Sequence, residues 1–198
     1  MPDDGDPGGT MRILVVEDEF LIAEQLSRDI SNLGDTVIGP FSDIGDAMCS
    51  LTSADAEAAI LDVRLGAQTS FCIADQLSLQ EVPFVFLTGY TARDVPDRFS
   101  QTVIHAKPSP TRSLLLQLHA QRLRFGDADG VQEVMVDMLS YVRLVASDAA
   151  AAERLVERVM LQAIRAIEGG DAVTGTLRGL MIALMDHEIA RNLPRHFH

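Results

Sequence analysis

The sequence has little of what several common classes of protein require. It contains no tryptophan, and aromatic residues make up only 5% of its 198 residues. Opening promoter DNA and holding it open takes aromatic side chains for stacking, so the absence of tryptophan is unfavourable for that activity. No apolar run approaches the roughly 18 residues that a membrane span needs, so we expect no membrane segment.

Cysteine and signal sequences are also lacking. The chain has only Cys49 and Cys72, both within apolar stretches. A disulfide framework would need more cysteines, so we expect reduced thiols in the core of a cytoplasmic protein. The first ten residues, MPDDGDPGGT, are acidic and have no hydrophobic signal region. They predict a disordered leader over residues 1–10.

Basic residues are scarce relative to acidic ones. The chain has 16 Lys and Arg against 29 Asp and Glu, a net charge of -13, divided as -9 over residues 1–125 and -4 over residues 126–198. Neither part has the basic footprint that binding to a phosphate backbone requires, so direct DNA binding is not expected. A metal ion or a basic protein is a better partner for the acidic part.

Residues 11–125 alternate between short apolar runs and segments of helical periodicity. Strands are predicted at 12–16, 36–39, 58–63, 82–89 and 102–106. Helices are predicted at 20–34, 43–51, 69–80 and 111–123, the last with Thr111 as its N-cap. A helix at 94–101 is less regular, because Pro96 falls in its first turn. This order predicts an α/β fold, with a five-stranded parallel sheet and helices on both faces.

The rest of the chain has no strand pattern. Residues 126–130, GDADG, predict a linker. Apolar residues then recur at helical spacing over 131–147, 149–168 and 174–192. We therefore expect a small all-α domain of about three helices over residues 131–198, with Ser147 or Asp148 capping its second helix.

Polar residues fall where the predicted parallel strands end. These residues are Glu17, Asp18, Asp62, Thr88 and Lys107. Groups at the carboxyl ends of parallel strands converge on one edge of the sheet. Three carboxylates would repel one another there unless a cation lay between them, and hard oxygen ligands suit Mg²⁺.

Asp62 and Lys107 fit a phosphoryl-accepting role at this edge. Asp62 lies in the apolar stretch AAILDVRLG, where a carboxylate is costly unless it is paired or coordinated. A carboxylate beside Mg²⁺ can attack a phosphoryl group and form an acyl phosphate. Lys107 is the only lysine beside fifteen arginines. A compact ammonium suits contact with one phosphoryl oxygen better than a guanidinium fork, which explains why this lysine is retained.

Four motifs carry a resemblance to a known family. They are ILVVEDE (13–19), AILDVRLG (59–66), FVFLTGY (84–90) and AKP (106–108). In this order and spacing, residues 12–123 resemble the receiver domain of two-component response regulators, which has a flavodoxin-like fold. The resemblance implies a regulator that switches protein contacts and is not an enzyme acting on a metabolite.

The resemblance also implies roles for individual residues. Asp62 would be the phosphoacceptor, and a sensor histidine kinase or a phosphotransferase would be the donor. The Mg²⁺ ligands would be Asp18, Asp62, the backbone carbonyl of Arg64 and, through water, Glu17. Thr88 and Lys107 would contact the phosphoryl oxygens.

Two positions depart from the family pattern. Receivers usually have an aromatic residue three positions before the lysine, where this chain has Ile104, and commonly Phe after Lys-Pro, where it has Ser109. The run FLTGY resembles a subfamily with Phe-x-Thr-Gly-Tyr at the end of its fourth strand. Tyr90 then either replaces the missing switch aromatic or is a packed surface tyrosine. We expect phosphorylation to order residues 89–99.

The helical part resembles region 2 of bacterial sigma factors over residues 139–167 and 177–195. The chain has no tryptophan, the predicted helix at 174–192 has no aromatic residue, and residues 126–198 are net negative, whereas opening promoter DNA requires aromatic and basic side chains. A sigma-shaped surface without this chemistry suits a decoy that binds an anti-sigma factor and so regulates transcription indirectly. Regulators of that kind in the alphaproteobacterial general stress response carry the sigma-like part first and include a second sigma region, so the order here is reversed.

Two other interpretations of the helical part remain open. The run HEIARNLP (187–194) is similar to the phosphoacceptor box of some histidine kinases, which would make His187 a phosphotransfer residue. Alternatively, the helices form a plain dimerisation unit, which allows a homodimer. For a sigma-like output, we expect the receiver to cover the helices at rest and phosphorylation to shift that docking.

Overall fold

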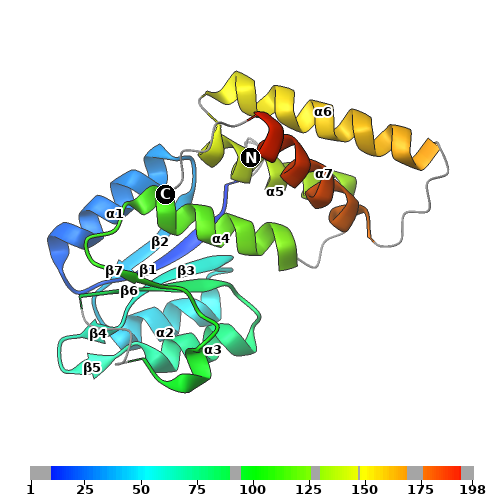
Figure 1. Ribbon diagram of the computed structural model, residues 1–198. Helices are drawn as coiled ribbons and strands as arrows, with labels where there is room; N and C mark the ends of the chain where they lie inside the picture. The colour runs from blue at the N-terminus through cyan, green and yellow to red at the C-terminus, as the bar shows by residue number, and fades with distance from the viewer. Residues whose placement is uncertain (1–9, 90–94, 126–129, 147, 169–175, 193–198) are drawn as a thin grey trace, which may run out of the picture. The chain divides into compact units, whose positions relative to one another are not determined.

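The computed structural model describes residues 10–89, 95–125, 130–146, 148–168 and 176–192 (Figure 1). The chain divides into two compact units, Met1–Leu118 and His119–His198. Within the described ranges, no helix is both long and apolar enough to cross a membrane.

The first unit is built on a five-stranded parallel sheet. Its strands, in the spatial order β2-β1-β3-β6-β7, are β2 (Thr36–Phe41), β1 (Arg12–Val16), β3 (Ala58–Asp62), β6 (Phe84–Thr88) and β7 (Ile104–Ala106). Its helices are α1 (Phe20–Asn32), α2 (Ile44–Ser53), α3 (Phe71–Leu79) and α4 (Thr111–Phe125), the last of which extends past Leu118. Figure 1 shows α1 and α4 on one face of the sheet and α2 and α3 on the other. The predicted flavodoxin-like α/β fold is confirmed.

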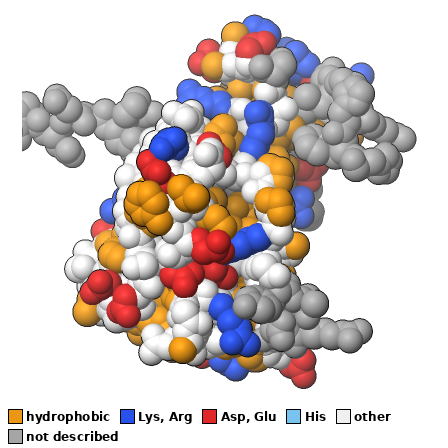
Figure 2. Space-filling model, turned by 90° about the vertical axis from the view of Figure 1, so that its left-hand side faces the viewer, with side chains coloured by type: hydrophobic (Ala, Val, Ile, Leu, Met, Phe, Trp, Pro, Cys, Tyr) orange, Lys and Arg blue, Asp and Glu red, His pale blue; other side chains and the backbone are white. Residues whose placement is uncertain are grey.

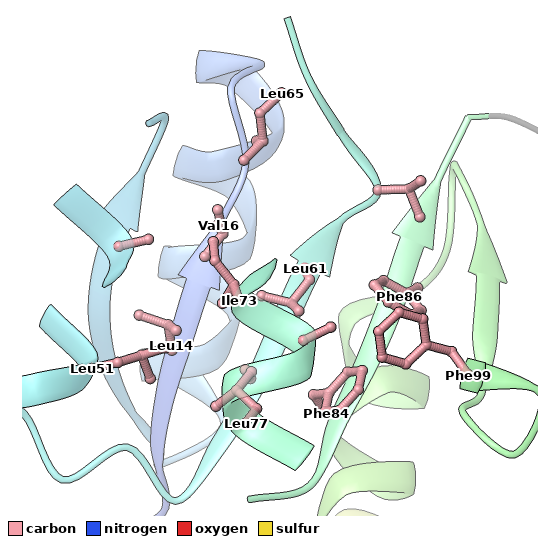
Figure 3. Close-up of a cluster of buried hydrophobic side chains, with 14 residues drawn as sticks. Leu14, Val16, Leu51, Leu61, Leu65, Ile73, Leu77, Phe84, Phe86 and Phe99 are labelled. Atoms are coloured by element: carbon pink, nitrogen blue, oxygen red, sulfur yellow. The ribbon is translucent and has the colours of Figure 1, made fainter. Parts of the chain in front are cut away.

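The central strands are buried on both faces, which explains their continuous apolar runs. Alternate residues such as Leu14 and Val16 on β1 join one core cluster with α2, α3 and Phe99 (Figure 3). The residues between them, such as Ile13 and Val15, are fully buried as well. A sheet of this kind holds the carboxyl ends of its strands at fixed positions.

The prediction that both cysteines are core thiols is wrong. Cys49 and Cys72 are free and exposed. Cys49 lies two residues after buried Ala47 and two before buried Leu51, so the helical period turns it to the outer face of α2. Cys72 precedes buried Ile73 on α3 and is turned outward for the same reason.

Three local features also differ from the sequence prediction. The Thr111 hydroxyl does not cap α4; it donates to Asp29 Oδ2 of α1 at 2.7 Å, and α4 begins at Thr111 itself. An antiparallel hairpin, β4 (Arg64–Leu65) with β5 (Gln68–Thr69), follows β3 and was not predicted. Of the segment 94–101, the described residues form one 3-10 turn, η2 (Asp97–Phe99).

The second unit contains three further helices: α5 (Val131–Val145), α6 (Ala149–Glu168) and α7 (Leu177–Asn192). Their core includes Val134, Val159 and Met181, one from each helix, together with Leu123 from the end of α4. Asp148 caps α6, since its Oδ1 accepts from the Ala151 N–H at 2.7 Å. Ser147 and the linker residues 126–129 lie outside the described residues.

An ion network is buried in this second core. Asp137 of α5 accepts from Arg122 Nε at 2.8 Å and from Arg178 Nη1 at 2.9 Å. Arg178 of α7 also donates to the carbonyl of Leu123 at 3.0 Å. The network therefore ties the end of α4 to α5 and α7.

Candidate functional site

Polar side chains from four strands meet at one edge of the sheet. Glu17 follows β1, Asp62 ends β3, Thr88 ends β6 and Lys107 follows β7. The five strands of this sheet pair in parallel. The register places Asp62 opposite Leu87, directly before Thr88. The backbone N–H of Lys107 donates to the Thr88 carbonyl at 2.8 Å. The topology therefore brings these predicted residues to one place.

Lys107 is the cation of this edge. Its Nζ lies 2.7 Å from Asp62 Oδ2 and 2.8 Å and 2.7 Å from Oε1 and Oε2 of Glu17. A third carboxylate, Glu19, accepts from the same Nζ at 3.1 Å. Glu17 and Asp62 are buried, so each needs this ammonium to offset the cost of leaving water.

The same edge offers oxygen atoms suited to a divalent cation. Ligand atoms of Glu17, Asp18 and Asp62 all lie within 4.8 Å of one another. Oε2 of Glu17 is buried and accepts no hydrogen bond of good geometry in the described part of the chain. Asp18 Oδ2 accepts from the N–H of Gly66, in the β4–β5 turn, at 2.8 Å. Carboxylate oxygens around a small space fit Mg²⁺.

The charges at this edge shift the ionisation of two groups. The pKa of Glu17 is raised from 4.5 to about 7, mainly because burial disfavours the charged form. The hydrogen bond from Lys107 opposes this shift, and the nearby Asp62 carboxylate adds to it. Burial alone lowers the pKa of Lys107, but hydrogen bonds to Asp62 and Glu17 outweigh burial and raise it. Lys107 therefore stays charged at neutral pH.

Of the other predicted site residues, Thr88 and Arg64 lie at this edge and His187 does not. Thr88 is buried beside Lys107, and the N–H of Arg64 donates to Asp62 Oδ1 at 3.1 Å. Tyr90 lies outside the described residues. His187 belongs to α7 in the second unit, where its side chain is exposed.

Two contacts at this edge were missed by sequence reasoning. Glu19 reaches Lys107, and the Gly66 N–H reaches Asp18. The available signal for Glu19 was the third acidic residue of the EDE run. For Gly66 it was a glycine directly after the Asp62 strand, here with φ +59, in the left-handed region that favours glycine.

One face of the molecule shows how charged and apolar side chains are distributed. Acidic side chains gather beside basic and hydrophobic ones on this face (Figure 2). Next to the acidic edge, Phe20 and Leu21 at the start of α1 are 73% and 78% exposed. Two large apolar side chains are therefore open to solvent beside the charged edge.

Comparisons with known proteins place the first unit in a family. No model of a known protein family and no curated protein matches the chain. Among solved structures, SdrG from Sphingomonas melonis Fr1 is 33% identical, with a TM-score of 0.51, over 58% of this chain and 97% of that one.

Two further structures agree with this match. The receiver domain of the response regulator PhyR from Erythrobacter litoralis is 25% identical over 61% of this chain and 95% of that one, with a TM-score of 0.51. The chemotaxis protein CheY4 of Vibrio cholerae is 22% identical over 57% and 98%, with a TM-score of 0.50, and supports the fold alone. These matches cover the N-terminal part of the chain. Through that part, the chain belongs to the family of response-regulator receiver domains.

Proposed function

We propose that the protein is a response regulator of a phosphorelay, which accepts a phosphoryl group on Asp62 and changes the protein contacts of its helical unit. One observation carries the phosphoacceptor assignment. Lys107 Nζ contacts both Asp62 and Glu17 at a buried edge of the sheet. The receiver family supports the same role for this edge.

The transfer itself needs little from the protein beyond position and charge. An oxygen of Asp62 attacks the phosphorus of a phosphohistidine on the donor, so that a P–O bond forms while the P–N bond breaks. The electron pair of the broken bond returns to the ring nitrogen, which regains a proton. Lys107, already at Asp62, offsets charge that builds up on the phosphoryl oxygens. Thr88 supplies a hydroxyl at the same edge.

The carboxylates at this edge fit a magnesium ion. Asp18 and Asp62 would hold it directly and Glu17 through water, with the Arg64 carbonyl as a backbone ligand. When bound, Mg²⁺ supplies positive charge that offsets the charge of the transferring phosphoryl group. This assignment is supported by the carboxylate oxygens of Glu17, Asp18 and Asp62, which lie within 4.8 Å of one another.

Exposed apolar residues support a protein as the phosphoryl donor. Phe20 and Leu21 follow the EDE run directly and are exposed. A small-molecule donor would not need such a surface, whereas a helix of a histidine kinase or phosphotransferase could pack on it.

The helical unit is the output part of this proposal. Its three helices, its net negative charge and the absence of aromatic residues from α7 support contact with a protein rather than with DNA. We assign it as a sigma-like decoy for an anti-sigma factor, which would regulate transcription indirectly.

Phosphoryl labelling tests the acceptor assignment. The full chain with Mg²⁺ should take up label from a phosphohistidine donor or acetyl phosphate, whereas Asp62→Ala should take up none. The matched control is Asp75→Ala, which should label normally. It removes an exposed carboxylate of α3 that pairs with Arg98 of η2. Normal labelling of Asp62→Ala would show that the phosphoacceptor is another residue.

A further inference from the structure

Glu19 contacts Lys107 but does not belong to the group of carboxylates that could hold a metal ion. We propose that Glu19 is a positioning residue, which holds the Lys107 ammonium at rest and is the contact that an incoming phosphoryl oxygen displaces. This inference rests on the proposed phosphoacceptor function. In this role, Glu19 sets how readily the Lys107 ammonium becomes available to a phosphoryl oxygen.

The ammonium of Lys107 has no N–H group to spare. A lysine side chain has three donors, and in the structure they meet three carboxylates: Glu17, Asp62 and Glu19. A phosphoryl oxygen can therefore gain a hydrogen bond from Lys107 only if one of these contacts is exchanged.

Glu19 is the contact that costs least to exchange. The side chains of Glu17 and Asp62 are 1% and 7% exposed, whereas that of Glu19 is 63% exposed. Its oxygen is also the farthest from Nζ, at 3.1 Å against 2.8 Å and 2.7 Å for the two hydrogen-bonded oxygens of the others. Losing the ammonium would leave Glu17 or Asp62 buried without its cation, but water can solvate a released Glu19.

The Glu19 side chain has no role as a helix cap. Glu19 occupies the N-cap position of α1, yet its side chain makes no capping hydrogen bond. Ser, Thr, Asp and Asn are the favoured residues at that position, because a short side chain can reach the backbone N–H groups of the first turn. The longer side chain of Glu19 instead extends to Lys107, which lies 88 positions later in the sequence.

Replacing Glu19 should therefore make the phosphoryl state easier to reach. Glu19→Gln keeps the length but removes the charge, and Glu19→Ser removes the reach while supplying a favoured N-cap. Both changes remove negative charge near an incoming anion. Glu19→Ser also frees a donor of Lys107, whereas the amide oxygen introduced by Glu19→Gln can still accept from the ammonium, but more weakly than a carboxylate. We expect apparent affinity for beryllofluoride with Mg²⁺ to rise about two- to fivefold in Glu19→Gln, in line with an exposed ion pair, and at least as much in Glu19→Ser.

The experiment measures beryllofluoride binding by fluorine NMR on the full chain, alongside the thermal midpoint without ligand. The control is Glu24→Gln, which removes a charge from the same helix, where Glu24 pairs with Arg28, and should leave binding unchanged. Unchanged or weaker binding by Glu19→Gln and Glu19→Ser would overturn the positioning role. A purely structural role would alter the thermal midpoint of Glu19→Ser without altering affinity.

The same titration separates this inference from the proposed function. If wild type binds beryllofluoride and Asp62→Ala does not, the phosphoacceptor assignment holds. The affinities of the Glu19 variants then decide whether Glu19 is a positioning residue. If wild type and Asp62→Ala behave alike, the phosphoacceptor assignment fails and the role of Glu19 fails with it.

Discussion

At the scale of single residues, one ammonium group pairs with several carboxylates. Lys107 contacts Glu17, Glu19 and Asp62, and Asp18 lies close to two of these. The pKa of Glu17 is raised mainly because the carboxyl is buried, and the Asp62 carboxylate beside it adds to the shift. The edge is therefore suited to gain a divalent cation, which would relieve repulsion that one lysine cannot remove.

Lys107→Arg tests why the chain keeps its single lysine. The Lys107 side chain is only 10% exposed and meets three separate carboxylates, so a planar guanidinium cannot match these contacts with the same geometry. We expect the rate of Asp62 phosphorylation to fall about ten- to hundredfold, as when a charge-stabilising donor is misplaced. Stopped-flow or radiolabel kinetics with acetyl phosphate measures this rate.

The reciprocal substitution is the control for this test. Arg12→Lys changes a partly exposed arginine whose ion-pair partners are Asp55 and Glu57. An exposed pair tolerates the exchange, so phosphorylation should proceed at the wild-type rate. A Lys107→Arg protein that phosphorylates as fast as wild type would show that the site needs only a positive charge.

At the scale of helices and strands, the sequence predicted the frame of the site well. Buried parallel strands carry long apolar runs, so Asp62 at the end of AAILD stood out, and the shared edge followed from the topology. The hairpin β4–β5 was missed because two-residue strands have no periodicity to detect. The cysteines were misplaced because an apolar neighbourhood does not fix which side of a helix a residue occupies. Glu19 was not assigned, since the four motifs gave roles only to Glu17 and Asp18 in the EDE run, and the contact with Lys107 appears only in the folded chain.

The buried network of Asp137 links α5 to α7 and to the end of α4. Asp137→Ala would leave Arg178, which is 5% exposed, without its carboxylate. Breaking a buried pair in this way costs about 3–5 kcal/mol, since an uncompensated charge remains in the core. We expect urea unfolding, followed by circular dichroism, to show a loss of this size.

Asp186→Ala is the matched control for the network. Asp186 faces Arg124 at 3.9 Å, and both side chains are more than half exposed. Removing such a pair should change the free energy of unfolding by about 0–1 kcal/mol. Equal losses in the two variants would mean that burial adds nothing to the Asp137 network.

At the scale of the whole molecule, charge limits which partners are suitable. Both parts of the chain are net negative, -9 over residues 1–125 and -4 over 126–198. Binding to a DNA backbone would need a basic surface, and neither part has the composition for one. For the proposed response regulator, this composition favours an output through contact with another protein.

Capture of partners from cell lysate tests this output. The bait is the full chain with Mg²⁺, with and without beryllofluoride as a mimic of the phosphoryl group, and bound proteins are identified by mass spectrometry. We expect a small anti-sigma protein to be recovered only with the mimic, because in the proposed switch a phosphoryl group on Asp62 makes the helical unit available to its partner. A coupling of about 1–3 kcal/mol would change recovery five- to more than a hundredfold.

An Asp62→Ala bait separates the switch from constitutive binding. It should recover the anti-sigma protein equally weakly with and without the mimic, because it lacks the acceptor carboxylate. Recovery only of kinases or phosphotransfer proteins, in both states, would contradict the decoy assignment. The helical unit would then belong to the relay itself. His187, exposed on α7, would be the first residue to substitute, with loss of phosphoryl transfer from Asp62 as the decisive result.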